Sequence, residues 1–303
     1  MPAWSRPRRA WRAGGRTIAP GAPGRPGDLR GVPADRSSRL TKGTSVKPSV
    51  DPTPLYARLG SSARMRTKTL RAHERVRRIA AHGGYAAWSG GKDSTVVAHL
   101  VRETGMRVCF FDSGMELPET VPYIVAVAQQ LDLRLESIAA RPSAWESLEA
   151  SRVWENGSPL APDWRRLTNL HELTIAGPSR TAHRRYGAGE VLGLRAAEGV
   201  KRRRLFAHAD DGVYRRLDGT AVACPIWDWT DDDVLAYLAY HRIGLNPIYD
   251  KLRAVGAPPR ARRVDSIFDD TALTYGRLVW LQRGWPSVYD ELIRRLPRIR
   301  DYA

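Results

Sequence analysis

The sequence contains little cysteine, and this bounds the chemistry it can perform. Cys109 and Cys224 are the two cysteines among 303 residues, and neither belongs to a C-x-x-C pair or a metal-ligand spacing. An iron–sulfur cluster held by four thiolates is therefore excluded. Cys109 lies in an apolar stretch, residues 107–111, so we expect it to pack rather than react. Scarce cysteine is typical of a reducing compartment, and we predict a cytoplasmic protein.

Long apolar runs are absent as well. No stretch reaches the roughly 18 apolar residues that a spanning helix needs, so the sequence predicts no membrane span and no membrane partner. The first residues carry basic side chains without an apolar stretch after them, so no secretory signal is expected.

Acidic side chains are scarce in the first fifty residues, where eleven Lys and Arg face two Asp. Seven prolines and seven glycines interrupt every periodic pattern there. Such a segment buries too little surface to offset its ordering entropy. We predict residues 1–50 to be a disordered basic arm, which either contacts nucleic acid or is a non-native N-terminal extension.

The most informative feature is a hexapeptide between a short apolar run, 85–88, and a helical pattern, 95–102. It reads Ser89-Gly90-Gly91-Lys92-Asp93-Ser94. Adjacent glycines let a backbone approach an anion, and the following helix directs the positive end of its dipole there. The Lys92 amine and the Ser89, Ser94 and Thr95 hydroxyls add donors. The pattern therefore predicts a phosphate-binding loop.

This hexapeptide resembles the SGGKDS pyrophosphate-binding loop of the ATP pyrophosphatase superfamily, whose members cleave ATP between its α and β phosphates. The pattern G-x-x-x-x-G-K-[ST] fails, because Ala86 replaces its first glycine and Asp93 follows the lysine. The resemblance implies that residues 89–95 bind an adenine nucleotide and that Lys92 and Asp93 are catalytic.

Helical and strand patterns alternate from residue 64 onward. We predict helices over 64–81, 95–103 and 118–131 and strands over 85–88, 107–112 and 134–138, with Pro118 in the first turn of its helix. The alternation predicts an α/β fold with a doubly wound parallel sheet, whose ligands bind at the carboxyl ends of the strands. The resemblance implies the adenine nucleotide α-hydrolase-like (Rossmann-like) version, with a nucleotide-binding domain over 63–255 and a helical C-terminal tail over 256–303.

A second segment, residues 110–120, resembles the DTGxEFPET segment of phosphoadenosine phosphosulfate (PAPS) reductases. It implies that Asp112 binds the nucleotide and orients Mg²⁺ together with Asp93, while Glu116 contacts substrate. The residues alone leave an alternative open, in which Asp112 caps a turn and Glu116 is a solvated loop charge.

A third segment, residues 190–202, resembles the family stretch G-[IV]-R-A-x-E-S-x-x-R, with Gly199 in place of the serine. The resemblance implies that Gly193 and Arg195 bind the nucleotide. It also implies that Glu198 and Arg202 contact substrate. The forked guanidinium of Arg195 suits phosphate oxygens, and we expect it to be catalytic.

A fourth segment, residues 223–250, resembles the family's PI-x-x-W and NPLYD elements. We expect it mainly to pack, with Thr230 as a helix N-cap and Val234, Leu235 and Leu238 in its buried stripe. Trp227 and Trp229 are also expected to belong to the core.

PAPS reductases use a cysteine in a C-terminal ECGLH-type motif, and residues 256–303 contain no cysteine. PAPS reduction by that mechanism is therefore disfavoured. We expect an enzyme that binds Mg²⁺ and ATP, or another adenine nucleotide such as PAPS, and that adenylylates an acceptor. Two alternatives stay open: a nucleic-acid modification factor similar to DNA phosphorothioation proteins, and a non-catalytic nucleotide-binding module. The sequence also leaves open a homo-oligomer and the role of residues 141–180, whose Trp154, Trp164 and His171 either line an acceptor pocket or pack.

Overall fold

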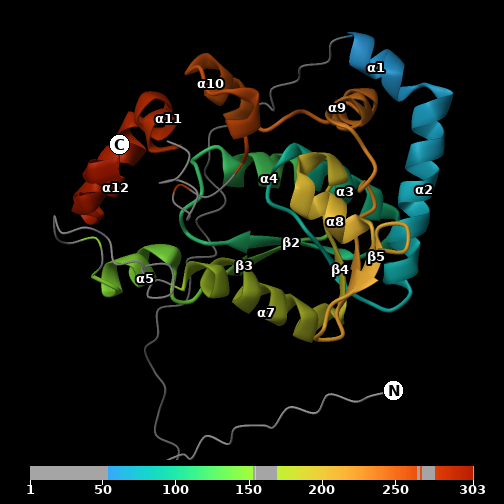
Figure 1. The fold of residues 1–303 in the computed structure, drawn as a ribbon, viewed down its shortest axis with the longest axis horizontal. Helices are drawn as coiled ribbons and strands as arrows, with labels where there is room; N and C mark the ends of the chain where they lie inside the picture. Colours follow the sequence, from blue (N-terminus) through green and yellow to red (C-terminus); the bar gives the residue numbers. More distant parts are fainter. Residues whose placement is uncertain (1–53, 153, 155–168, 265–266, 268–276, 303) are drawn as a thin grey trace, which may run out of the picture. The chain divides into compact units, whose positions relative to one another are not determined.

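Short buried strands alternate with helices in the computed structural model, which describes residues 54–152, 154, 169–264, 267 and 277–302 (Figure 1). Its sheet has the order β3-β2-β1-β4-β6-β5, in which β5 and β6 pair antiparallel and all other neighbours pair parallel. The predicted α/β fold with a mostly parallel sheet is confirmed. The strands are β1 (Tyr85–Ala87), β2 (Arg107–Asp112), β3 (Leu135–Ala139), β4 (Gly189–Val191), β5 (Val213–Arg215) and β6 (Ala221–Ala223).

Helices cover both faces of the sheet, with α3 and α4 on one side and α7 on the other (Figure 1). The helices that flank the sheet are α2 (Ala63–Ala80), α3 (Lys92–Val101), α4 (Thr120–Gln130), α7 (Gly177–Tyr186), α8 (Val200–Phe206) and α9 (Asp231–Tyr240). The others are α1 (Pro54–Gly60), α5 (Ala144–Ala150), α10 (Ile248–Ala254), α11 (Arg277–Gly284) and α12 (Pro286–Arg295). Single turns include η3 (Glu172–Ala176) and η4 (Ala196–Glu198). Among the described residues, no helix is long and apolar enough to cross a membrane.

Local sequence explains where these helices begin. Ser62 caps α2 by accepting the Met65 N–H, and Thr230 and Asp233 form a capping box at α9, as the sequence predicts for Thr230. The helix expected over 118–131 begins later, at Thr120. Pro118 lies before it, because the Thr120 N–H closes a turn onto the Leu117 carbonyl at 2.9 Å.

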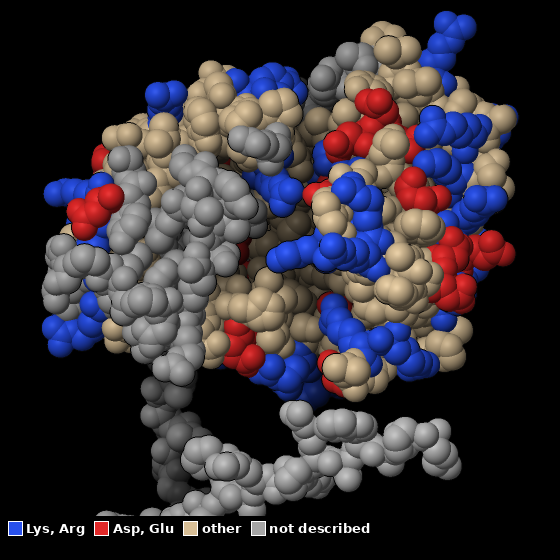
Figure 2. All heavy atoms as spheres, viewed as in Figure 1, with Lys and Arg blue, Asp and Glu red and all other residues tan. Residues whose placement is uncertain are grey.

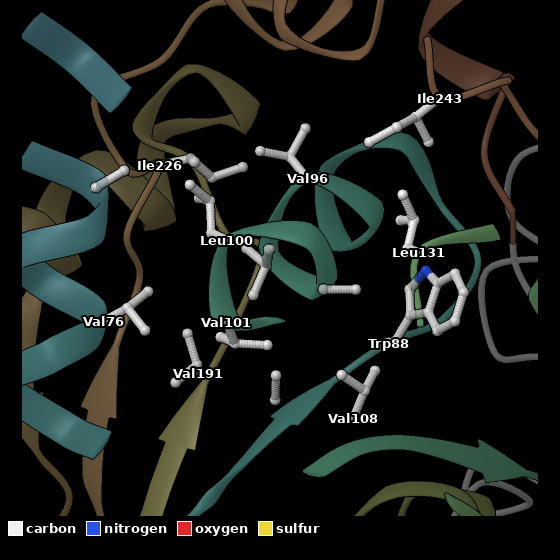
Figure 3. Packing of buried hydrophobic residues seen from close by; sticks show 14 of the residues in the cluster. Val76, Trp88, Val96, Leu100, Val101, Val108, Leu131, Val191, Ile226 and Ile243 are labelled. Carbon is white, nitrogen blue, oxygen red and sulfur yellow. The ribbon is translucent and has the colours of Figure 1, made fainter. Parts of the chain in front are cut away.

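The main core fills the space between the sheet and helices α2, α3 and α4 (Figure 3). Trp88, Val96, Leu100 and Val191 are almost fully buried in it. Each fully buried Val or Leu contributes about 1.5–3 kcal/mol, so this packing holds the end of β1 against the start of α3. Cys109 and Trp229 are buried as predicted, whereas Leu235, Trp227 and Phe111 are only partly buried.

A second core joins the C-terminal helices to the segment after β2. Leu117, Leu148 and Trp154 pack there with residues of α10, α11 and α12, so this core crosses the boundary expected at residue 255. Trp154 therefore packs, and His171 is exposed at the start of η3. Trp164 and the arm over residues 1–50 lie outside the described residues.

Candidate nucleotide-binding site

The loop over residues 89–94 connects β1 to α3 at the carboxyl edge of the sheet. Gly90 has φ +77°, a left-handed conformation that favours glycine. A Cβ there would also lie 3.3 Å from Ile124 Cγ1 and 3.4 Å from Asn246 Nδ2. Gly91 then precedes the first turn of α3 with extended backbone. The glycines therefore bring the open N-terminus of α3, and its N–H groups, to the strand end.

The three hydroxyl groups of this loop divide into two kinds. Ser94 Oγ donates to the Gly91 carbonyl at 3.0 Å and lies 3.1 Å from Ser89 Oγ, on the open side of the loop. Thr95 is fully buried, donates to the same Gly91 carbonyl at 2.9 Å and accepts the Trp88 indole N–H at 3.0 Å. Thr95 therefore braces the loop, whereas Ser89 and Ser94 are more exposed, and their nucleotide-binding role stays a prediction.

Two cations and two carboxylates form a closed network at the start of α3. Lys92 Nζ lies 2.8 Å from Asp93 Oδ2 and 2.8 Å from Asp231 Oδ1. Arg195 Nε lies 2.6 Å from Asp93 Oδ1, and its Nη2 lies 2.7 Å from the same Asp231 oxygen. The structure thus brings together Lys92, Asp93 and Arg195, three residues expected to be catalytic, and adds Asp231.

Burial makes this network energetically demanding. Arg195 is only 3% exposed, and its Nη1 also donates to the Trp229 carbonyl at 3.2 Å. Burial acts to lower the pKa of Arg195, but Asp93 and Asp231 outweigh it and raise that pKa above its ordinary value. Burial acts to raise the pKa of Asp231, and Lys92 and Arg195 outweigh it, so this pKa is lowered. The guanidinium is therefore charged and held in one orientation.

Gly193 places Arg195 by close packing. A Cβ at position 193 would lie 2.7 Å from the Ser94 nitrogen and 2.8 Å from the Asp93 carbonyl carbon. The chain leaving β4 therefore crosses directly over the backbone of the phosphate loop, which only a residue without a side chain allows. In this structure Gly193 contacts the backbone of the phosphate loop.

The end of β2 carries a carboxylate pair. Glu116 Oε1 accepts the Ser113 N–H at 2.9 Å and its hydroxyl at 2.6 Å, and Asp112 Oδ1 accepts the Gly114 N–H at 2.9 Å. Asp112 therefore caps a turn, which is the alternative to nucleotide binding that the sequence left open. Burial raises the pKa of Glu116 to about 7, the nearby Asp112 carboxylate adds to the rise, and the Ser113 hydrogen bonds oppose it. Glu116 can exchange a proton near neutral pH.

Comparison with known proteins places the chain in a family. Residues 85–263, more than half of the chain, match the family model described as "Phosphoadenosine phosphosulfate reductase domain". The chain belongs to this family. It is 28% identical over 190 residues to a phosphoadenosine 5'-phosphosulfate reductase of Xanthomonas campestris pv. campestris, covering 61% of this chain and 74% of that protein. With the one of Photobacterium profundum it shares 29% identity over 191 residues, 61% of this chain and 71% of that protein.

Among solved structures, the chain is similar to a phosphate complex of PAPS reductase from Candida auris. The two share 16% sequence identity with a TM-score of 0.46, covering 68% of this chain and 94% of that one. The family recognised from the sequence segments is thus confirmed by its family model, and with it an enzyme family of sulfur and nucleotide chemistry.

Two further residues of this family member reach the phosphate loop from the segment expected mainly to pack. The Tyr249 hydroxyl accepts the Lys92 N–H at 3.0 Å, and Asn246 Nδ2 donates to the Gly90 carbonyl at 3.4 Å. In the sequence, the NPLYD-like stretch was the feature that pointed to Asn246 and Tyr249. It indicated a family element, but not that its polar groups meet the loop.

Glu198 and Arg202, expected to contact substrate, lie on η4 and α8. Their side chains approach each other at 3.7 Å, and the structure records no contact of either with the phosphate loop within the described part of the chain. Figure 2 shows Lys and Arg side chains gathered over α8 beside a hollow in this face. Their substrate role stays a prediction.

Asp93 and Asp112, the carboxylates expected to orient Mg²⁺, have protein partners in this structure. Both carboxylate oxygens of Asp93 engage cations, Arg195 and Lys92. The described residues contain no group of three or more His, Cys, Asp or Glu side chains placed to hold a metal. Magnesium in nucleotide enzymes is bound largely through substrate phosphates, so the joint role expected for Asp93 and Asp112 stays a prediction.

Proposed function

We propose that the chain binds ATP on residues 89–95 and transfers its adenylyl group to an acceptor, releasing pyrophosphate. The network of Lys92, Asp93, Arg195 and Asp231 at the N-terminus of α3 is the observation that carries this proposal. The Asp231 side chain is 68% exposed, unlike its partners. Incoming phosphate oxygens can therefore displace Asp231 from Lys92 and Arg195 while Asp93 keeps both cations in place.

The chemistry follows from this arrangement. A nucleophilic atom of the acceptor attacks the α phosphorus, and the bond from that phosphorus to the bridging oxygen breaks. Its electron pair leaves with pyrophosphate, whose charge Lys92 and Arg195 stabilise. Glu116, at the end of the neighbouring strand β2, takes the proton of the acceptor. Its pKa, raised by burial to about 7, suits a general base at neutral pH.

PAPS is the nucleotide in the names of the relatives, and it is the second candidate ligand. The cysteines argue against its reduction by this chain. Both are fully buried, and burial raises the pKa of each to about 12. Since a thiolate is the nucleophile in such chemistry, neither side chain is placed to attack a sulfur centre.

Thermal unfolding of the full chain with Mg-ATP, PAPS or GTP, followed by a pyrophosphate-release assay, tests the proposal. A nucleotide at 100 times its dissociation constant adds about 2.7 kcal/mol to the free energy of unfolding. We expect ATP to stabilise the wild type and not Lys92→Ala. Stabilisation by PAPS but not by ATP would show that the nucleotide bound is a sulfonucleotide and not ATP. No shift with any adenine nucleotide would overturn the proposal.

A further inference from the structure

A cavity of about 560 Å³ lies between the carboxyl end of β3 and helix α7, with lining residues from the first to the last turn of that helix. Residues 138–140 contribute to its lining, together with apolar parts of η3 and α7. Its volume is within the range of sites for small organic ligands. The polar lining consists of Arg141, Glu172, Arg180, Thr181, Arg184 and Arg185.

Positive charge exceeds negative charge around this cavity. Arg180 pairs with Glu172, and Arg185 pairs with Glu136 of β3. Arg184 donates to the Thr181 hydroxyl at 2.9 Å. Within the described ranges, no carboxylate partner is recorded for Arg141 or Arg184. Clustered like charges repel one another, so this arrangement becomes favourable when an anion enters.

One end of the cavity reaches the ligand-binding edge of the sheet. β3 pairs parallel with β2, Ala139 stands opposite Asp112, and the Ala140 N–H donates to the Asp112 carbonyl at 2.7 Å. β2 in turn pairs with β1, which leads into the phosphate loop. Two strand spacings, about 10 Å, therefore separate β3 from the strand that carries that loop. The two sites are distinct and open at the same edge.

We propose that this cavity is a second anion site, which binds a phosphate-bearing ligand through Arg141 and Arg184. The two guanidinium groups come from different elements, the loop after β3 and the last turn of α7, and both line the cavity. Guanidinium forks match the paired oxygens of phosphate and are always charged.

Phosphates of two sources share this chemistry, the backbone of a nucleic acid strand and a free organic phosphate. Figure 2 shows basic side chains over α7 and over α8 on the same face. The exposed residues of α8 include Lys201, Arg203 and Arg204. A strand lying along both helices would meet cations at several phosphates, which favours the nucleic acid.

The test compares Arg141→Ala/Arg184→Ala with a control of equal charge, Arg58→Ala/Arg77→Ala, whose exposed arginines lie on α1 and α2. A fluorescent single-stranded oligonucleotide is titrated into the full-length proteins at several salt concentrations. Inorganic pyrophosphate is titrated separately in a Lys92→Ala background, which weakens the phosphate loop. Neither titration requires ATP cleavage, so this inference can fail or hold independently of the proposed function.

A nucleic acid ligand predicts that the cavity variant binds the oligonucleotide at least about tenfold more weakly. The slope of log affinity against log salt should also fall by about 1.4, for two lost contacts to a single strand. A free phosphate predicts loss of pyrophosphate affinity alone. Both results support the site. Equal behaviour of the cavity variant and the control, or unchanged affinity for both probes, would overturn it.

Discussion

Two parts of one sheet edge use positive charge in opposite ways. At β1, Lys92 and Arg195 are each held by two carboxylates, and the guanidinium is almost fully buried. At β3, Arg141 and Arg184 are exposed and have no recorded carboxylate partner in the described part of the chain. The charges at β1 stabilise the folded protein without a ligand. The charges at β3 form a favourable interaction only when a ligand is bound.

This difference bears on how the two sites could be recognised. A buried, neutralised network must be built from residues of several segments, because each charge needs its partner. An exposed surplus of charge needs no partner for folding and can be removed without loss of stability. Substitutions at the two places should therefore separate stability from binding.

Arg195→Ala should produce the largest effect, because it acts on stability and on turnover together. It leaves Asp93 and Asp231 facing each other without their guanidinium, so we expect a loss of about 2 kcal/mol in the free energy of unfolding. Loss of one preorganised donor should reduce ATP cleavage by about 100-fold or more. Chemical denaturation and pyrophosphate release measure these effects.

The matched variant at the other part of the edge is Arg184→Ala, for which we expect a stability change within about 0.5 kcal/mol. Arg195→Lys is the second control, because it keeps the charge and loses the fork. Equal destabilisation by Arg195→Ala and Arg184→Ala would contradict the claim that the charges at β1 stabilise the fold and those at β3 do not.

Gly193→Ala and Gly91→Ala should sharpen the description of the phosphate loop. A Cβ at 193 meets loop backbone at 2.7 Å, whereas one at 91 meets its nearest neighbour, Ser89 Oγ, at 3.5 Å. We expect Gly193→Ala to cost about 1–3 kcal/mol of stability. Gly91→Ala should be close to neutral for folding and weaken nucleotide binding, because its methyl group enters the ligand space. Thermal unfolding with and without ATP distinguishes them, and a stable Gly193→Ala protein would contradict the close crossing.

Glu116 should give the next largest effect, in the pH dependence of stability. Burial raises the pKa of Glu116 from its ordinary 4.5 to about 7, so the folded protein binds more protons than the unfolded chain between these values. The contribution of Glu116 to the free energy of unfolding is therefore fully present below pH 4.5 and is lost as the pH rises through 7. Its size is about 1–3 kcal/mol.

Glu116→Gln should remove that contribution, so the melting temperature of the variant should fall less than that of the wild type between pH 5 and about 8. His99 contributes to stability in the opposite sense, because burial lowers its pKa to about 4, but this histidine is present in both proteins. Parallel curves for the two proteins would contradict the raised pKa.

Local signals in the sequence predicted much of this fold. The bounds of β2 agree with those expected, and α2 and the Thr230 cap of α9 lie where periodicity and capping residues indicated. These features depend on neighbours a few residues apart. The late start of α4 is a partial exception, since the turn that closes before Thr120 competes with the preference of proline for a first helical turn.

Long-range contacts set the limit of that prediction. Asp231 joins the network from a helix start distant in sequence, where an acidic first turn already explains an aspartate. Tyr249 reaches Lys92 from a segment whose apolar residues indicate packing. The arginines of α7 form a cavity only once β3 stands beside that helix. In each case the sequence shows the residue but does not indicate which distant residue it contacts.

Cys224→Ala should produce the smallest effect, and it addresses which chemistry the β1 site supports. The thiol is fully buried beside Phe206 and Val222, and burial raises its pKa to about 12. We expect a loss of roughly 1 kcal/mol in stability from the lost packing. Pyrophosphate release should stay within about twofold of the wild type, because the thiol is too buried and too weakly acidic to react. Cys109→Ala, in the buried strand β2, serves as the matched control. If Cys224→Ala alone abolished turnover, the thiol would take part in the reaction, and sulfonucleotide reduction would displace adenylyl transfer as the function of this edge of the sheet.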